Sequence, residues 1–397
     1  MHQSLGLAGA AIVASAAALL PQSALAHPVG AHSAGSHGVG ASAHPSRGHR
    51  STPVPDPNAC SPRVAAVGYS DALDKLQVDG AEVSGLSSLA WDARQRAWVS
   101  ALDNNGQTTP EYLWSFRDLS DPRVLHAPLV LKKADGTPYD GGPAATDPNA
   151  ADDEGLAVLP NGDYLVSSET EPSIRVFGRD GVQRAELPVP ARFAVTGTTT
   201  AGEATSNATL EGLTITPDGR TIVASMEGAL SGDVSASGDA TAHRLLVYRL
   251  GRHGHWTLAK QVEYRTGAGM RIPEIAAYSN NALVVEEATW SATTGNVVRL
   301  FAVDGLRRAR DVSAVTNLGE APGRLALPKT ELADLVDCPT LGASALEFQQ
   351  NPLLDNYEGM AITGRERGGR YGLTLVSDDN NSALQHTRLL NLSVRLP

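Results

Sequence analysis

The sequence DDEGLAVLPNGDYLVSSETEP, at residues 152–172, has the pattern of a β-hairpin with acid at both ends. Three carboxylates open it, two apolar runs follow on either side of Pro-Asn-Gly-Asp, and Glu169 and Glu171 close it. Pro-Asn-Gly is typical of tight turns, and apolar runs of strand length on both sides predict two antiparallel strands. We therefore expect a hairpin whose two open ends carry carboxylates.

The same plan returns four more times, at residues 84–104, 210–228, 273–287 and 357–380. Each copy has a small residue or Gly, an apolar strand, a polar turn, a second apolar strand and then a polar, mostly acidic segment. The segments after the first four hairpins each resemble two further strands around a turn. Repeated four-stranded units are typical of a β-propeller. A β-sandwich, the structural alternative, does not explain why one motif occurs five times.

The last unit is incomplete, because only HTRLLNLSVRLP remains after it, which is enough for one strand. Residues 63–69 (RVAAVGY) have no hairpin of their own. We expect them to supply the missing outer strand and close the ring. A sixth unit could lie in residues 320–348, although residues 330–336 look more helical than extended. The predicted fold class is all-β, a β-propeller of five to six four-stranded blades closed by an N-terminal strand.

The N-terminal region has the features of an export signal. Residues 5–20 form an apolar run, and Ala24-Leu25-Ala26 has the small-x-small pattern of a cleavage site, which predicts a signal peptide over residues 1–26. Residues 27–59 are rich in Gly, Ser, Pro and His without apolar periodicity, as expected of a disordered linker. The propeller domain is then residues 60–397. We expect a secreted protein, extracellular or periplasmic if the source has an outer membrane, with no membrane span.

The chain has two cysteines, Cys60 and Cys338. An even number in an exported protein indicates a disulfide, which would pin the ring near its closure. The two residues lie in distant segments without Cys-x-x-Cys spacing, which argues against a metal or nucleophile role.

Composition excludes one large class of function. The formal net charge is −11 and aromatic residues make up only 5% of the chain, whereas nucleic-acid binding needs a basic face. An acidic surface allows a cation site. The expected ligand is a small molecule or glycan, and we expect a monomer.

Hairpin geometry predicts that the acids meet. The start of the first strand and the end of the second lie on the same face, opposite the turn. Radial repetition then brings the acids of all units around one channel mouth. The acids concerned are Asp103, Asp152, Asp153, Glu154, Glu169, Glu171, Glu211, Glu227, Glu274, Glu286, Glu287, Glu358, Asp378 and Asp379.

So many carboxylates on one face need protonation, hydrogen bonds, arginine partners or a bound cation. Oxygen ligands without clustered His or Cys favour Ca²⁺ or Mg²⁺ over zinc. The alternative is that each Glu of a Glu-Gly pair only ties down its neighbouring loop by accepting backbone N–H bonds. The candidate metal ligands are Asp152, Asp153, Glu154, Glu211, Glu358, Asp378 and Asp379.

Catalytic candidates follow from the same acids. A carboxylate beside a metal-polarised substrate can serve as general base, and we assign this role to Glu169, with Glu154 as the second catalytic candidate. Gly-x-Ser-x-Gly, His-Glu-x-x-His and phosphate-loop motifs are absent from the sequence.

The candidate substrate-binding residues are Arg175, Arg244, Arg299, Glu171 and Glu227. The three arginines open third strands, and each could equally be an ordinary surface residue.

The set of motifs resembles a phytase-like family, known as "esterase-like activity of phytase". The resemblance covers about residues 60–397 and implies an exported propeller that hydrolyses an ester or phosphoester. Three interpretations stay open: a metal-dependent hydrolase of a phosphoester or carboxylic ester, a non-catalytic Ca²⁺-stabilised module that binds a glycan or partner protein, and a lactonase-like propeller. The matching elements are GYSDALDK (68–75), SGLSSLAWD (84–92), DDEGLAVLPNGDYLVSSETEPSIRVFGRDG (152–181), LEGLTITPDG (210–219) and NYEGMA (356–361).

Overall fold

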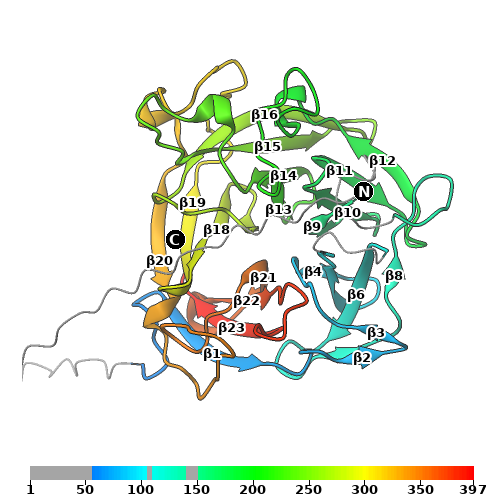
Figure 1. The fold of residues 1–397 in the computed structure, drawn as a ribbon, viewed down its shortest axis with the longest axis vertical. Coiled ribbons are helices and arrows are strands. Elements are labelled where there is room, and N and C mark those ends of the chain that lie inside the picture. The colour runs from blue at the N-terminus through cyan, green and yellow to red at the C-terminus, as the bar shows by residue number, and fades with distance from the viewer. Residues whose placement is uncertain (1–55, 105–109, 140–150) are drawn as a thin grey trace, which may run out of the picture. The chain divides into compact units, whose positions relative to one another are not determined.

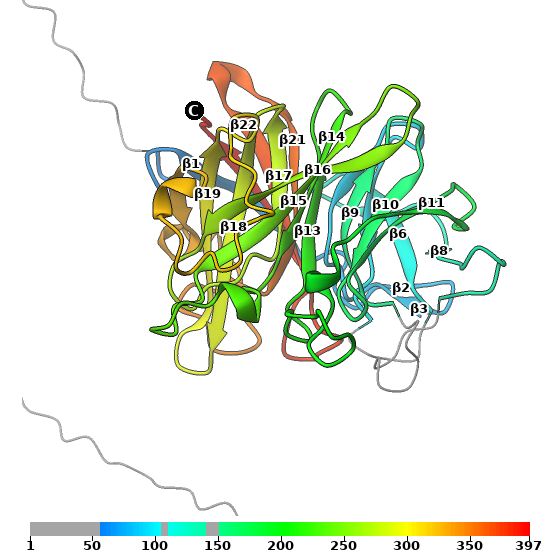
Figure 2. The ribbon, with the colours of Figure 1, turned by 90° about the horizontal axis from the view of Figure 1, so that it is seen from above.

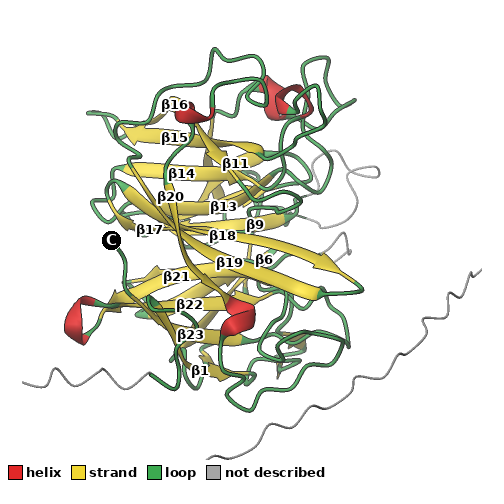
Figure 3. Cartoon of the chain, turned by 90° about the vertical axis from the view of Figure 1, so that its left-hand side faces the viewer, coloured by secondary structure: helices red, strands yellow, loops and turns green. Residues whose placement is uncertain are grey.

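The computed structural model describes residues 56–104, 110–139 and 151–397. In these residues the chain is almost entirely strand and loop, and its helices are short 3₁₀ turns (Figure 3). None of those helices is long and apolar enough to cross a membrane. The predicted signal peptide and residues 27–55 of the predicted linker lie outside the described residues. The 3₁₀ turns are η1 (Ala191–Phe193), η2 (Ser231–Asp233), η3 (Gly323–Leu325), η4 (Leu335–Asp337) and η5 (Arg367–Gly369).

Five antiparallel sheets form the blades, and a separate pair is formed by β2 (Gln77–Val78) and β3 (Ala81–Glu82). The first blade is β4 (Ala90–Asp92), β5 (Ala97–Ala101), β6 (Tyr112–Arg117) and β7 (Arg123–Val124), with β8 (Leu129–Val130) also on β6. The second is β9 (Asp153–Val158), β10 (Tyr164–Ser168), β11 (Ser173–Phe177) and β12 (Gln183–Leu187). The third is β13 (Leu210–Ile215), β14 (Thr221–Met226), β15 (Ala242–Leu250) and β16 (Trp256–Arg265). The fourth is β17 (Ile275–Ser279), β18 (Ala282–Ser291), β19 (Gly295–Asp304) and β20 (Lys329–Asp334). The fifth is β21 (Tyr357–Arg365), β22 (Tyr371–Ser377), β23 (Leu389–Val394) and β1 (Val64–Ser70).

The first strands of the blades form a closed ring. In chain order β4 contacts β9, β9 contacts β13, β13 contacts β17, β17 contacts β21, and β21 returns to β4. Figure 1 shows β4, β9, β13 and β21 nearest the centre with β12, β16 and β20 outside, and Figure 2 shows β9, β13, β16 and β21 from above. The apolar clusters lie between neighbouring blades, for example between the second and third. The predicted β-propeller is confirmed, with five blades in the described residues.

The ring closes as the sequence predicted. β1 pairs antiparallel with β23, from Val64 opposite Val394 to Ser70 opposite Leu389, and so supplies the outer strand of the fifth blade. The predicted disulfide between Cys60 and Cys338 is present. It joins the segment before β1 to the end of η4, and both cysteines are buried in the apolar cluster between the fourth and fifth blades. The disulfide therefore lies beside the closure.

The expectation of a sixth unit in residues 320–348 was wrong. β20 lies there and pairs with β19, so it is the outer strand of the fourth blade, and residues 330–336 are mostly extended. The outer strand comes late in the sequence because residues 305–328 first cross to the third blade. There the Val312 N–H donates to the Gln261 carbonyl at 3.0 Å. This insertion enlarged the spacing that suggested an extra unit.

The glycine of each Glu-Gly pair has a packing role. A Cβ on Gly155 would lie 2.3 Å from the Glu211 carbonyl oxygen, and one on Gly359 would lie 2.8 Å from the Ser88 Cα. Both contacts are with the first strand region of the next blade. The Ser167 hydroxyl also donates to the Glu211 carbonyl at 2.8 Å. The Gly is therefore needed where neighbouring blades approach, and this closeness sets the spacing of the acids beside it.

We expect Gly155→Ala to lower the free energy of unfolding by about 3 kcal/mol, the upper end for overpacking, because the clash is with backbone. Urea denaturation measures the change. Gly323→Ala is the matched control, since a Cβ there meets nothing within 4 Å. Equal losses in the two variants would contradict the packing argument.

Candidate functional site

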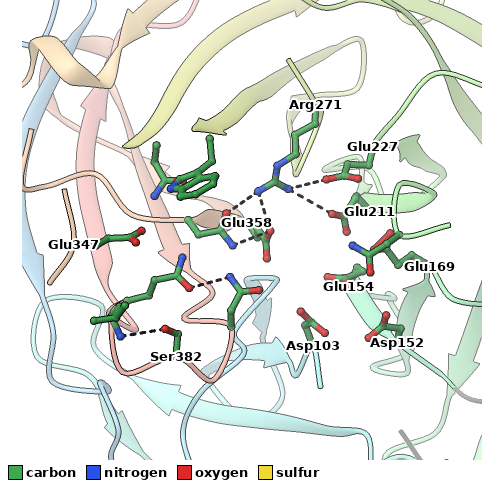
Figure 4. A pocket seen from close by; sticks show the side chains of 17 residues that line it. Asp103, Asp152, Glu154, Glu169, Glu211, Glu227, Arg271, Glu347, Glu358 and Ser382 are labelled. Carbon is green, nitrogen blue, oxygen red and sulfur yellow. Dashed lines mark hydrogen bonds and ion pairs between the residues drawn. The ribbon is translucent and has the colours of Figure 1, made fainter. Parts of the chain in front are cut away.

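A cavity of about 420 Å³ lies at the channel mouth where the first strands begin and the second strands end (Figure 4). In the described part of the chain, one basic residue, Arg271, is among those that line it. Trp290, Leu384 and several amide side chains complete its wall. The acidic residues that line it are Asp103, Asp152, Glu154, Glu169, Glu211, Glu227, Glu347 and Glu358.

The hairpins place these acids. Glu154, Glu211 and Glu358 lie in the first residues of β9, β13 and β21, whereas Glu169 and Glu227 directly follow β10 and β14. Since a hairpin returns to the face from which it started, both ends of each hairpin reach one mouth. The structure therefore brings together acids from four blades, including Asp103 just after β5.

Three overlapping groups of carboxylates have their oxygens within 4.8 Å of one another. Two opposite oxygen ligands of a Ca²⁺ ion are about 4.6–5.2 Å apart, so each group has the separation that this ion needs. Glu154 and Glu169 each belong to two groups. The groups are Asp103–Glu154–Glu358, Asp152–Glu154–Glu169 and Glu169–Glu211–Glu227.

Burial and mutual repulsion shift the protonation of these acids. The pKa values of Glu154 and Glu211 are raised well above the usual range, first by burial and then by neighbouring carboxylates. Asp103 and Glu169 have pKa values raised for the same reasons. The pKa of Asp152 is also raised, chiefly by burial. The cluster on its own therefore retains protons that a cation could replace.

One buried carboxylate oxygen in the cavity lacks a donor. Asp152 is 7% exposed, and its Oδ1 has no hydrogen-bond partner, while its Oδ2 accepts from the Thr170 hydroxyl at 2.9 Å. An unsatisfied buried acceptor is unfavourable unless something else binds it. Together with the all-oxygen donor set, this fits a hard divalent cation such as Ca²⁺ or Mg²⁺.

Arg271 was not singled out from the sequence. Its guanidinium donates to Glu227 and Glu358 at 2.9 Å and to the Asn356 side-chain oxygen at 2.7 Å, and lies 3.7 Å from Glu211. Burial would lower its pKa, but Glu358, Glu227 and Glu211 outweigh burial and raise it. One sequence feature could have pointed to Arg271. The fourth unit has Pro-Glu-Ile where the second, third and fifth units have Glu-Gly, and Arg271 lies three residues before the Glu of that sequence.

Three predicted metal ligands do not line the cavity. Strand alternation turns Asp153 away from Asp152 and Glu154, toward Arg175, and burial raises its pKa to about 7. Asp379 pairs with Lys75 and accepts from the Gly85 N–H at 3.0 Å. Asp378 is buried and accepts from the Asn380 N–H at 2.8 Å.

The three candidate arginines also lie elsewhere, because third strands lie away from the channel. Arg175 pairs with Glu171 at 2.8 Å, on the outer side of the second blade. Arg244 is fully buried and donates to Asp233 through two nitrogens, at 2.6 and 2.8 Å. Arg299 pairs with Asp334 at 2.7 Å. Each of these arginines thus has a carboxylate partner outside the cavity, and Glu171, the partner of Arg175, does not line the cavity either.

Two acids of the fourth blade, Glu274 and Glu287, accept backbone N–H bonds as the structural alternative expected of the Glu-Gly glutamates, whereas Glu286 accepts none. Glu274 accepts from the Leu213 N–H at 2.9 Å and ties its loop to the third blade. Glu287 pairs with Lys329 and accepts from the Tyr264 hydroxyl at 2.6 Å. Glu286 is fully buried, and burial raises its pKa well above the usual range. None of the three lines the cavity.

The fold and the cavity together define a five-bladed β-propeller with an acidic pocket at one mouth of its channel. The chain belongs to the Phytase-like family, whose model, described as "Esterase-like activity of phytase", matches residues 81–381. This confirms the resemblance seen in the motifs. A search of curated proteins found no match.

Solved structures resemble the chain only in general architecture. A protein of unknown function from Dyadobacter fermentans DSM 18053 is 12% identical with a TM-score of 0.43, covering 84% of this chain and 100% of that one. The gluconolactonase XC5397 from Xanthomonas campestris is 16% identical with a TM-score of 0.35, covering 84% and 90%. The PQQ-bound aldose sugar dehydrogenase from Streptomyces coelicolor is 13% identical with a TM-score of 0.36, covering 81% and 84%. We base no functional argument on these similarities.

Proposed function

We propose that this chain is an exported, divalent-cation-dependent hydrolase of carboxylic or phosphoric esters. The observation that carries the proposal is the set of overlapping carboxylate groups that share Glu154 and Glu169 in one cavity. The family description, esterase-like activity of phytase, agrees with it. Export is supported by the disulfide between Cys60 and Cys338, because disulfides persist in oxidising compartments.

The residues proposed to hold the cation line the cavity and belong to these groups. Glu154 is shared by two groups, and Asp152 offers its unfilled oxygen. Ca²⁺ or Mg²⁺ bound there would polarise the ester oxygen and lower the pKa of a bound water. Arg271 holds Glu227 and Glu358 in place and offsets part of the negative charge. A cation held by these carboxylates would thus present an electrophilic centre to an ester oxygen.

Glu169 is the proposed general base. The Thr209 N–H donates to Glu169 Oε2 at 3.3 Å, which fixes the carboxylate and leaves Oε1 to accept a proton from water. Burial, Glu227 and Asp152 raise its pKa, and a raised pKa brings a carboxylate closer to the range where a base works well near neutral pH. Its position directly after β10 keeps it beside Glu154 and Glu211.

Turnover of p-nitrophenyl acetate, p-nitrophenyl phosphate and a simple lactone, with Ca²⁺ or with EDTA, tests the proposal. We expect ester or phosphate hydrolysis that needs the cation, and Glu169→Gln to lower kcat about 100-fold with little change in KM. Glu186→Gln, an exposed acid on the outer strand β12, is the matched control and should keep wild-type kcat.

The alternatives give different results in the same assay. Hydrolysis of the lactone alone would favour a lactonase-like propeller. No turnover of any substrate, with a Ca²⁺-dependent rise in melting temperature, would refute the hydrolase and favour a Ca²⁺-stabilised binding module for a glycan or partner protein.

A further inference from the structure

Exposed apolar side chains gather beside the acidic cavity. Six large hydrophobic side chains are exposed in the described residues, and four of them belong to segments at this cavity. Trp290 (55% exposed) and Leu384 (57%) line it, and Leu346 and Phe348 flank the lining residue Glu347. We call these four residues the apolar rim. Contiguous exposed apolar surface on a soluble protein usually marks a binding site.

The rim is built by three segments, and two of them contact each other directly. Trp290 lies near the end of β18, and the adjoining turn packs against the loop that carries Leu346 and Phe348. The Asn296 N–H donates to the Gln349 side-chain oxygen at 2.7 Å, and Arg388 donates to the Ser344 carbonyl at 2.8 Å. The loop is therefore held at both ends, next to the turn that follows Trp290.

Trp290 also lines a second hollow. A second cavity of about 540 Å³ adjoins the acidic one, and the two share Glu227, Arg271 and Trp290. Small residues make up much of the second wall, among them Ala229, Ala240 and Ala268. The space beside the indole is thus large and unobstructed, enough for a ring or a chain of several carbons.

From this arrangement we propose that the site takes an ester with a sizeable apolar acyl, alkyl or aryl part, which lies on the apolar rim while the ester group enters the acidic cavity. This rests on the proposed function and narrows it to amphiphilic esters. An indole face and leucine and phenylalanine side chains bind apolar groups and give no hydrogen bonds to a heavily charged substrate. The acids lie behind the apolar rim, inside the cavity, where a small molecule can reach them more easily than the surface of a partner protein can. The expected ligand is therefore a small molecule.

Binding is tested first, without catalysis and without a cation. The neutral apolar dye N-phenyl-1-naphthylamine is titrated by fluorescence into the wild type, Trp290→Ala, Phe348→Ala and Trp91→Ala. We expect the two rim variants to weaken dye binding about tenfold. Trp91→Ala is the matched control, because Trp91 is similarly exposed (47%) but lines an apolar pocket formed by other parts of the first strands. Unchanged affinity in the rim variants, or an equal loss in Trp91→Ala, would overturn the proposal.

Turnover of p-nitrophenyl acetate, butyrate and octanoate is the second arm. We expect kcat/KM of the wild type to rise with chain length, by up to about fourfold for each fully buried CH₂. In Trp290→Ala the octanoate-to-acetate ratio should fall about tenfold, and in Trp91→Ala it should stay as in the wild type. A ratio unaffected by Trp290→Ala would refute the rim as a substrate site. Rim-dependent dye binding without turnover of any ester would instead refute the hydrolase and leave the apolar site standing.

Discussion

Adding Ca²⁺ to EDTA-treated protein at pH 8 is expected to raise the free energy of unfolding by about 4 kcal/mol at a thousandfold excess over Kd. That corresponds to a rise of roughly 8 °C in melting temperature, measured by differential scanning fluorimetry. The reason is the carboxylate cluster, in which buried acids such as Glu154 and Glu211 lie close together and Asp152 Oδ1 lacks a donor. A cation that binds the folded state alone removes that repulsion.

The effect should depend on pH in a definite direction. The folded pKa values of Asp103, Glu154, Glu169 and Glu211 are raised above their unfolded values, and that of Asp153 is raised to about 7. The folded state then holds protons that the unfolded chain has released, so stability without cation falls as pH rises from about 4 through 7 and above. Ca²⁺ needs ionised ligands, and its stabilising effect should therefore grow from pH 5 to pH 8.

Two comparisons make this test specific. Glu154→Gln should reduce the Ca²⁺-induced shift by half or more, because Glu154 belongs to two of the three carboxylate groups, whereas the exposed Glu186→Gln should leave the shift unchanged. KCl at matched ionic strength controls for general screening of charge. A shift that KCl reproduces, or that is as large at pH 5 as at pH 8, would contradict a cation bound by the cavity.

The fold could be predicted from the sequence because its evidence is local and repeated. The hairpin at residues 152–172 returns in five units, and hairpin geometry alone brings Glu154 and Glu169 to one face. Ring closure by β1 followed from the incomplete last unit. The position of β20 could not be predicted, because residues 305–328 cross to another blade before β20 begins. Such a long insertion has no periodic sequence pattern.

The site was predictable only to the level of the backbone. The sequence indicated the acids at the strand ends. It did not indicate that side-chain direction within β9 separates Asp153 from its neighbours, or that Asp379 forms an ion pair with Lys75. Arg271 lies outside every Glu-Gly motif, and its partners come from the third and fifth blades. Such pairings depend on the tertiary arrangement of three blades, for which a single sequence contains no local pattern.

Arg271→Ala is expected to lower the free energy of unfolding of the cation-free protein by about 3 kcal/mol. Loss of one partner leaves Glu227 and Glu358 buried without their counter-charge, and breaking a buried pair costs about 3–5 kcal/mol. The lower end applies because 26% of the Arg271 side chain is exposed. Urea denaturation in EDTA measures the loss, and the exposed Arg310→Ala is the matched control. Arg271→Lys should recover only part of the stability, since an ammonium cannot bridge both acids as the guanidinium does.

The same variant distinguishes a structural arginine from one that competes with the cation. Arg271 contacts Glu211, Glu227 and Glu358, which belong to the carboxylate groups that fit Ca²⁺. Removing its positive charge raises the attraction of the cavity for a divalent ion, so the Ca²⁺-induced gain in stability should be larger in Arg271→Ala than in the wild type. Ca²⁺ should then restore most of the stability lost in EDTA. An equal Ca²⁺-induced gain in the two proteins would mean that the cation does not share these carboxylates with Arg271.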